Sequence, residues 1–183
     1  MDTIKAAIFD LDGTLVDSMW VWERIDMEFL KKRGYTVPEN LKDNITHLSF
    51  KQVAQYFKTT FSIDDSVEAI MDEWHEMAYN EYSNNVFLKE GAMEYLHSLK
   101  KAGIKIALAT SNSKPLLEAT LKNNGIYDLF DSITVTDEVK KGKDNPDIYL
   151  LAAEKLNVNP VNCMVYEDIV AAVGGAKLAG MNV

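Results

Sequence analysis

The chain has 183 residues, of which 47% are hydrophobic and 26% charged, so it can bury a core and is neither a disulfide knot nor a disordered tail. Its formal net charge of −9 disfavours binding to nucleic acids and anionic membranes. With Cys163 as its one cysteine, the chain forms no internal disulfide and suits a reducing compartment. No signal-peptide pattern opens the sequence, and no apolar run reaches the ~20 residues of a membrane span. We therefore expect a soluble cytoplasmic protein, a monomer or weak dimer, with no nucleic-acid or membrane partner.

Four short apolar runs predict buried strands, at residues 4–9, 104–109, 132–135 and 163–166. They do not alternate polar and apolar residues, which is typical of strands covered on both faces of a parallel sheet. Helical patterns lie between them, at residues 115–124 and 146–156, and residues 181–183 look like the start of another strand. This alternating order predicts the α/β class, with a Rossmann-like doubly wound parallel sheet as the core.

Residues 18–86 interrupt the alternation, because they contain no convincing strand and strong helical spacing. One face of the first expected helix carries Trp22, Ile25 and Phe29. Ser49 is the expected start of a second helix, and Asp64 or Asp65 the expected cap of a third, which has Trp74 among its core positions. We therefore expect a catalytic core made of residues 1–17 and 87–183, with residues 18–86 inserted as an all-α cap.

Polar side chains directly follow the expected strands. They are Asp10 and Asp12, then Thr110, then Lys143 in the loop after the third strand, then Glu167 and Asp168. The carboxyl ends of parallel strands meet at one edge of a sheet, so we expect these side chains to come together there. Each feature alone has a plainer explanation, such as a turn, a helix cap or a surface lysine. Their shared position after consecutive strands favours a site.

Such a set of groups suits phosphoryl transfer. Closely placed carboxylates repel one another and need a counter-ion, and hard oxygen ligands suit Mg²⁺. A carboxylate beside the metal can attack phosphorus and form an aspartyl-phosphate. Thr110 and Lys143 can hold the phosphoryl oxygens, and a carboxylate two residues after the nucleophile can act as general acid and base.

The sequence also carries the motifs of a known superfamily. Residues 9–18 read FDLDGTLVDS, followed by ATSN at 109–112, GKDNPDIY at 142–149 and VYED at 165–168. The set resembles the haloacid dehalogenase superfamily, on the branch of phosphoglycolate phosphatases and β-phosphoglucomutases, which carries an α-helical cap. The resemblance covers nearly the whole chain.

The resemblance implies a role for each motif residue. Asp10 would be the nucleophile and a metal ligand, and Asp12 the general acid/base, with its backbone carbonyl on the Mg²⁺. The phosphoryl group would be bound by Thr110, Ser111, Asn112 and Lys143. Glu167 and Asp168 would complete the metal site. The implied activity is a Mg²⁺-dependent phosphatase acting on a small organophosphate monoester (a sugar phosphate, phosphoglycolate or a nucleotide) through an aspartyl-phosphate.

Two alternatives stay open. A β-phosphoglucomutase would usually have a His and an Arg where this chain has Trp22 and Phe50, which weakens the mutase interpretation. Ile169 and Ala172 stand where the family usually has Ser or Thr and Gly, so an inactive phosphate-binding module is the other alternative. Four residues are candidates for lining a substrate pocket or, more often at such spacing, for the core of the cap: Trp20, Trp22, His47 and Phe50.

Overall fold

The computed structural model describes residues 3–45 and 48–183 and divides the chain into two compact units. Residues 1–18 and 82–183 form the first, here called the sheet unit, and residues 19–81 form the second, the helical unit. His47 lies outside the described residues.

The sheet unit is built on four parallel strands in the order β3-β2-β1-β4. The strands are β1 (Ala6–Phe9), β2 (Lys105–Thr110), β3 (Ser132–Val135) and β4 (Cys163–Tyr166). The chain starts in the middle of the sheet, runs outward through β2 and β3, and returns to the other side of β1. The order therefore reverses at β1, and the predicted doubly wound α/β fold is confirmed.

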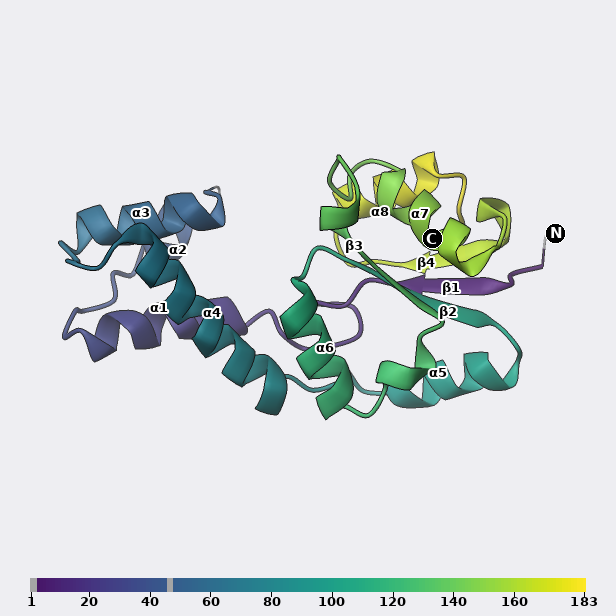
Figure 1. Ribbon diagram of the computed structural model, residues 1–183, viewed down its shortest axis with the longest axis horizontal. Coiled ribbons are helices and arrows are strands. Elements are labelled where there is room, and N and C mark those ends of the chain that lie inside the picture. The colour runs from purple at the N-terminus through teal and green to yellow at the C-terminus, as the bar shows by residue number, and fades with distance from the viewer. Residues whose placement is uncertain (1–2, 46–47) are drawn as a thin grey trace. The chain divides into compact units, whose positions relative to one another are not determined.

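Helices cover both faces of this sheet (Figure 1). On one face lie α7 (Asp147–Leu156) and α8 (Val170–Leu178), and on the other α5 (Ala92–Lys101) and α6 (Lys114–Asn123). The strands present small alanines toward α7, which lets the helix pack closely on them. Short 3₁₀ turns complete the unit at Tyr127–Leu129, Thr136–Glu138 and Pro160–Asn162.

The open backbone groups of the two edge strands, β3 and β4, are occupied in different ways. At β3, the Lys155 Nζ donates to the Ile133 carbonyl oxygen at 2.8 Å, and the Val135 amide donates to Glu138 Oε1 at 3.0 Å. Lys155 and Glu138 also form an ion pair at 2.7 Å, so charged side chains occupy backbone groups that an edge strand leaves open. At β4, Met164 forms a parallel bridge with Asn182, which confirms the predicted start of a strand at residues 181–183.

The helical unit contains α1 (Val21–Lys32), α2 (Leu41–Ile45), α3 (Phe50–Thr60) and most of α4 (Val67–Asn84). Its core is a set of aromatic rings packed edge to face. Trp74 lies 5.4 Å from Phe29 and 5.0 Å from Phe57, measured between ring centroids. Phe29 and Trp74 are buried as predicted, whereas Trp22, in the first turn of α1, is 37% exposed. Over residues 3–45 and 48–183, none of the helices has the length and apolar character to span a membrane.

One predicted helix start is confirmed and one is wrong. Ser49 caps α3 in a reciprocal capping box with Gln52. At α4, however, the cap is Ser66, whose Oγ accepts from the Ala69 amide at 3.1 Å, and not Asp64 or Asp65. The side chain of Asp65 is not free to cap α4, because it forms an ion pair with Arg33.

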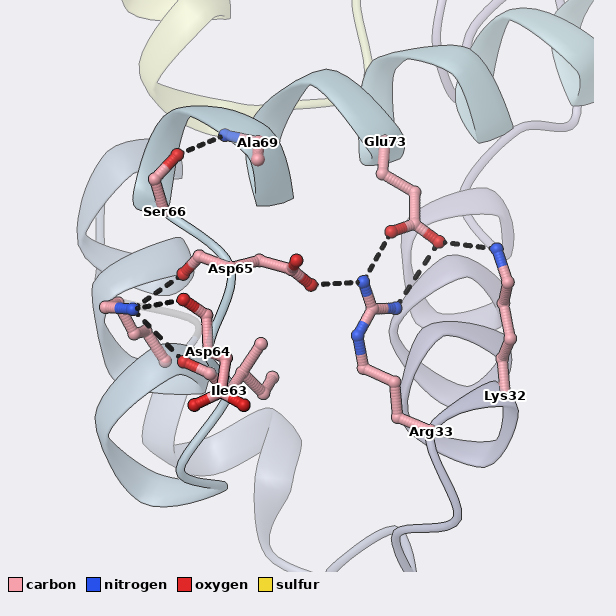
Figure 2. A network of polar contacts seen from close by, with 9 residues as sticks. Lys32, Arg33, Ile63, Asp64, Asp65, Ser66, Ala69 and Glu73 are labelled. Atoms are coloured by element: carbon pink, nitrogen blue, oxygen red, sulfur yellow. Dashed lines mark hydrogen bonds and ion pairs between the residues drawn. The ribbon is translucent and has the colours of Figure 1, made fainter.

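Arg33 at the end of α1 binds that aspartate and joins three segments of the helical unit (Figure 2). Its guanidinium donates to Asp65 Oδ2 at 2.8 Å and to Glu73 Oε2 at 2.6 Å, and lies 3.8 Å over the ring of Phe29. Lys32 adds a hydrogen bond to Glu73 at 2.9 Å. The Arg33 contacts hold the pKa of Glu73 below its usual range.

Replacing Arg33 with Lys should destabilise the helical unit by about 1 kcal/mol, because an ammonium group cannot make the forked contact to Glu73 and Asp65 together. Urea unfolding followed by tryptophan fluorescence measures this loss. Lys32→Gln is the matched control, since Lys32 is 72% exposed and its ion pair should contribute little. The difference between Arg33→Lys and wild type should shrink as the pH falls through the lowered pKa of Glu73, because the protonated carboxyl no longer pairs with Arg33. Equal stability of both variants would contradict the role of Arg33.

Candidate active site

Asp10 is the first residue after β1 and occupies the carboxyl end of the sheet. Its backbone amide donates to the Tyr166 carbonyl oxygen at 3.0 Å, and its side chain is buried. The following turn is closed by amides of Leu15 and Val16 donating to the Leu11 carbonyl, at 2.9 and 3.1 Å. A tight turn therefore fixes the direction in which Asp10 projects.

Lys143 bridges two carboxylates from different strands. Its Nζ donates to Asp10 Oδ1 at 2.7 Å and forms an ion pair with Glu167 Oε1. The Tyr149 hydroxyl on α7 also donates to Glu167 Oε1, at 2.9 Å. The structure thus brings together Asp10, Lys143 and Glu167, which sequence spacing alone placed at one edge of the sheet.

Burial is the main influence on the ionisation of Asp10. It raises the pKa of Asp10 to about 6, and Lys143 opposes the rise. Glu167 and Asp12 raise it further by charge repulsion. The nearby carboxylates therefore carry more negative charge than one lysine balances, and a second cation would favour the ionised form of Asp10.

Three carboxylates have the spacing of a cation site. Ligand atoms of Asp10, Glu167 and Asp168 all lie within 4.8 Å of one another. Glu167 Oε2 is buried and has no hydrogen-bond partner among the described residues, which is costly for an ionised group unless a cation binds it. Asp168 is exposed, and the Thr14 hydroxyl donates to it at 3.4 Å. These residues fit a hard divalent cation.

The carboxylate of Asp12 faces a different set of partners. The hydroxyls of Tyr82 and Ser18 donate to Oδ1 at 2.5 and 2.7 Å, and the Asn112 side-chain amide donates to Oδ2 at 2.8 Å. Asp12 is therefore held by neutral donors, and its side chain is not among the three clustered carboxylates. Its predicted contact to a metal through the backbone carbonyl stays a prediction.

The last residue of β2 and the two residues after it form a turn beside the Asp12 carboxylate. Thr110 is buried, and its Oγ1 accepts from the Asn112 amide at 3.0 Å. The adjacent Ser111 is exposed. The hydroxyls of Thr110 and Ser111 and the side-chain amide of Asn112 therefore lie at the carboxyl end of β2, the strand that pairs with β1.

Several supporting residues were not predicted from the sequence. Tyr82 and Tyr149 are both buried, and their spacing in the helices is that of ordinary core residues. Gly175 lies against the loop that carries Lys143, where an added Cβ would overlap the Lys143 carbonyl oxygen and lie 2.8 Å from that of Asn145. The paired glycines inside a helix pattern were the one available sign of such a close approach.

Comparison with known proteins gives the same assignment as the motifs. The sequence pattern of the haloacid dehalogenase-like hydrolases matches residues 4–180. The phosphorylated carbohydrates phosphatase of Thermotoga maritima is 32% identical over 97% of this chain and 82% of its own length. Hexitol phosphatase A of Escherichia coli is 34% identical over 98% of this chain and 81% of its own length.

A solved structure agrees with this relationship. A Thermotoga maritima protein provisionally named beta-phosphoglucomutase superposes with a TM-score of 0.89 at 31% identity, over 97% of this chain and 82% of that one. The matched length includes both the sheet unit and the helical unit. The chain therefore belongs to the haloacid dehalogenase-like hydrolases, on the branch of phosphatases and β-phosphoglucomutase-like proteins, and is a phosphoric monoester hydrolase.

Proposed function

We propose that the protein is a Mg²⁺-dependent phosphatase that hydrolyses a small phosphate monoester, with sugar and polyol phosphates favoured, through an aspartyl-phosphate on Asp10. The observation that carries the proposal is the bridge from Lys143 to Asp10 and Glu167, beside the unpartnered Glu167 Oε2. The substrate class comes from two relatives, one named for phosphorylated carbohydrates and one for hexitols.

In the first step, an Asp10 carboxylate oxygen attacks phosphorus, the new O–P bond forms, and the bond to the leaving alcohol breaks. Lys143 donates to the phosphoryl oxygens, as do the hydroxyl of Thr110 and the neighbouring polar groups of Ser111 and Asn112. Lys143 already lies 2.7 Å from Asp10, so it can move between the carboxylate and an incoming phosphoryl group.

Asp12 serves both steps as the proton carrier. It donates a proton to the leaving alkoxide and later takes one from the water that attacks the aspartyl-phosphate, which releases inorganic phosphate and restores Asp10. The Tyr82 and Ser18 hydroxyls hold the carboxylate in one orientation for these transfers.

Asp10, Glu167 and Asp168 would hold the Mg²⁺, with the Asp12 carbonyl as a further ligand. When bound, the ion supplies positive charge that lets a carboxylate and a phosphate approach each other. The helical insertion, expected at residues 18–86, would act as the cap that selects the alcohol part of the substrate.

Phosphate release from a panel of sugar phosphates, nucleotides and phosphoglycolate tests this function. Release should require Mg²⁺, stop with EDTA, and fall to background in Asp10→Asn, which keeps the shape of the side chain but removes the nucleophile. Hydrolysis that persists in folded Asp10→Asn would exclude the aspartyl-phosphate. Conversion of β-glucose 1-phosphate to glucose 6-phosphate with a bisphosphate primer would indicate a mutase. No turnover of any kind would favour a phosphate-binding module.

Tyr82→Phe should lower kcat on an alkyl phosphate about tenfold with little change in KM, because one of two donors to Asp12 Oδ1 is lost. The loss should be smaller on p-nitrophenyl phosphate, since nitrophenolate leaves without a proton. Tyr127→Phe removes a hydroxyl outside this cluster and is the control. Equal losses on both substrates would indicate a merely structural role for Tyr82.

Gly175→Ala should lower kcat by about tenfold or more, because the new methyl group would push the loop that positions Lys143. Gly174→Ala, in the same helix, is the matched control, since an added Cβ at position 174 would have no neighbouring atom within 4 Å. Steady-state kinetics on both variants, with melting curves to verify folding, give the comparison. If Gly175→Ala kept full activity, the close approach would have no bearing on Lys143.

A further inference from the structure

Thr120 joins α6 to the end of α4 within the sheet unit. Its hydroxyl donates to the Tyr82 carbonyl oxygen at 2.7 Å, and both residues are buried. Tyr82 lies in the last turn of α4, where backbone carbonyls have no partner within the helix. A buried carbonyl without a donor is costly, so the Thr120 hydroxyl satisfies a group that the helix itself leaves open.

The chain that follows Tyr82 is held by the same helix. The side chain of Asn124, one turn further along α6, accepts from the Leu88 amide at 3.1 Å and donates to the Val86 carbonyl oxygen at 2.9 Å. The last turn of α6 therefore fixes the path of residues 82–88 through side-chain hydrogen bonds to their backbone.

These backbone contacts bear on Asp12, because the Tyr82 hydroxyl donates to Asp12 Oδ1 at 2.5 Å. The Ser18 hydroxyl is a further donor to Oδ1. The loop that leads into α6 supplies Asn112, whose side-chain amide donates to Asp12 Oδ2 at 2.8 Å. Each oxygen of the Asp12 carboxylate thus has a donor whose position depends on α6 or on the loop in front of it.

We propose that Thr120 is a positioning residue for the proton transfers of Asp12. Its bond to the Tyr82 carbonyl fixes the end of α4, and this directs the Tyr82 hydroxyl at the carboxylate that gives and takes the proton. Thr120 acts through Tyr82 and is not itself a catalytic residue. The inference rests on the proposed function of Asp12, but the chain of hydrogen bonds can be measured without turnover.

Thr120→Val removes the hydroxyl with little change of shape and should lower kcat on an alkyl phosphate about fivefold, with KM unchanged. Thr120→Ser keeps the hydroxyl, so its kcat should stay near wild type even though the lost methyl group lowers the melting temperature. Thr134→Val is the matched control, because Thr134 is equally buried and its hydroxyl has no hydrogen-bond partner among the described residues. If Thr120→Val does not fold, Thr120→Ala takes its place in the same comparison.

A double-mutant cycle shows whether Thr120 acts through Tyr82. In the Tyr82→Phe background, Thr120→Val should cause no further loss of kcat, because the hydroxyl that Thr120 positions is already absent. The loss in the single variant should be smaller on p-nitrophenyl phosphate, as for Tyr82→Phe. Additive losses in the cycle, or equal kcat for Thr120→Val and Thr120→Ser, would overturn the proposal.

Proton NMR gives a readout that does not need activity. The Tyr82 hydroxyl proton, in a short bond to a carboxylate, should give a downfield signal that is absent in Tyr82→Phe. This signal should move upfield or exchange faster with water in Thr120→Val, and stay unchanged in Thr120→Ser and Thr134→Val. A wild type without the signal, or an unchanged signal in Thr120→Val, would contradict the positioning role. An inactive wild type that shows the expected NMR changes would contradict only the proposed phosphatase function.

Discussion

The repulsion among three carboxylates at the carboxyl end of the sheet is the constraint on which the rest of the sheet unit depends. Asp10 and Glu167 are brought together because β1 and β4 pair in parallel register. One ammonium group, that of Lys143, contacts both of them, and Asp168 is left in water. Burial raises the pKa of Asp10 and repulsion from Glu167 adds to the rise, while the single lysine leaves one buried oxygen of Glu167 without a donor among the described residues.

The lysine reaches this place through backbone packing. Its loop runs against α8 so closely that position 175 has no room for a side chain, and the amide of Asn145 closes the loop by donating to the Gly142 carbonyl at 3.0 Å. Asp12, two residues from Asp10, is oriented by neutral hydroxyl and amide donors instead. Asp10 and Asp12 thus have different surroundings, which suits the different roles proposed for them, nucleophile for Asp10 and proton carrier for Asp12.

The sequence predicts the sheet well, because its strands are buried on both faces and their apolar runs have few competing explanations. Prediction of the α4 start failed where Asp64, Asp65 and Ser66 all qualify as caps, since Arg33 removes Asp65 from the choice. The motif residues were predictable as a group from their positions after strands. The bond from Tyr82 to Asp12 was not, because it joins residues 70 apart and a tyrosine in a helix pattern looks like core.

The distribution of charge in the chain favours ligand groups of different charge in the two units. With a net charge of −9, long-range attraction cannot draw in a phosphate ester, so under the proposed function its recognition would depend on short-range groups such as Lys143 and a bound cation. A cavity of the helical unit has the opposite preference, because three carboxylates line it, those of Glu23, Asp26 and Glu39, against one described basic residue, Lys42. An anionic group is favoured only where a lysine and a cation can contact it.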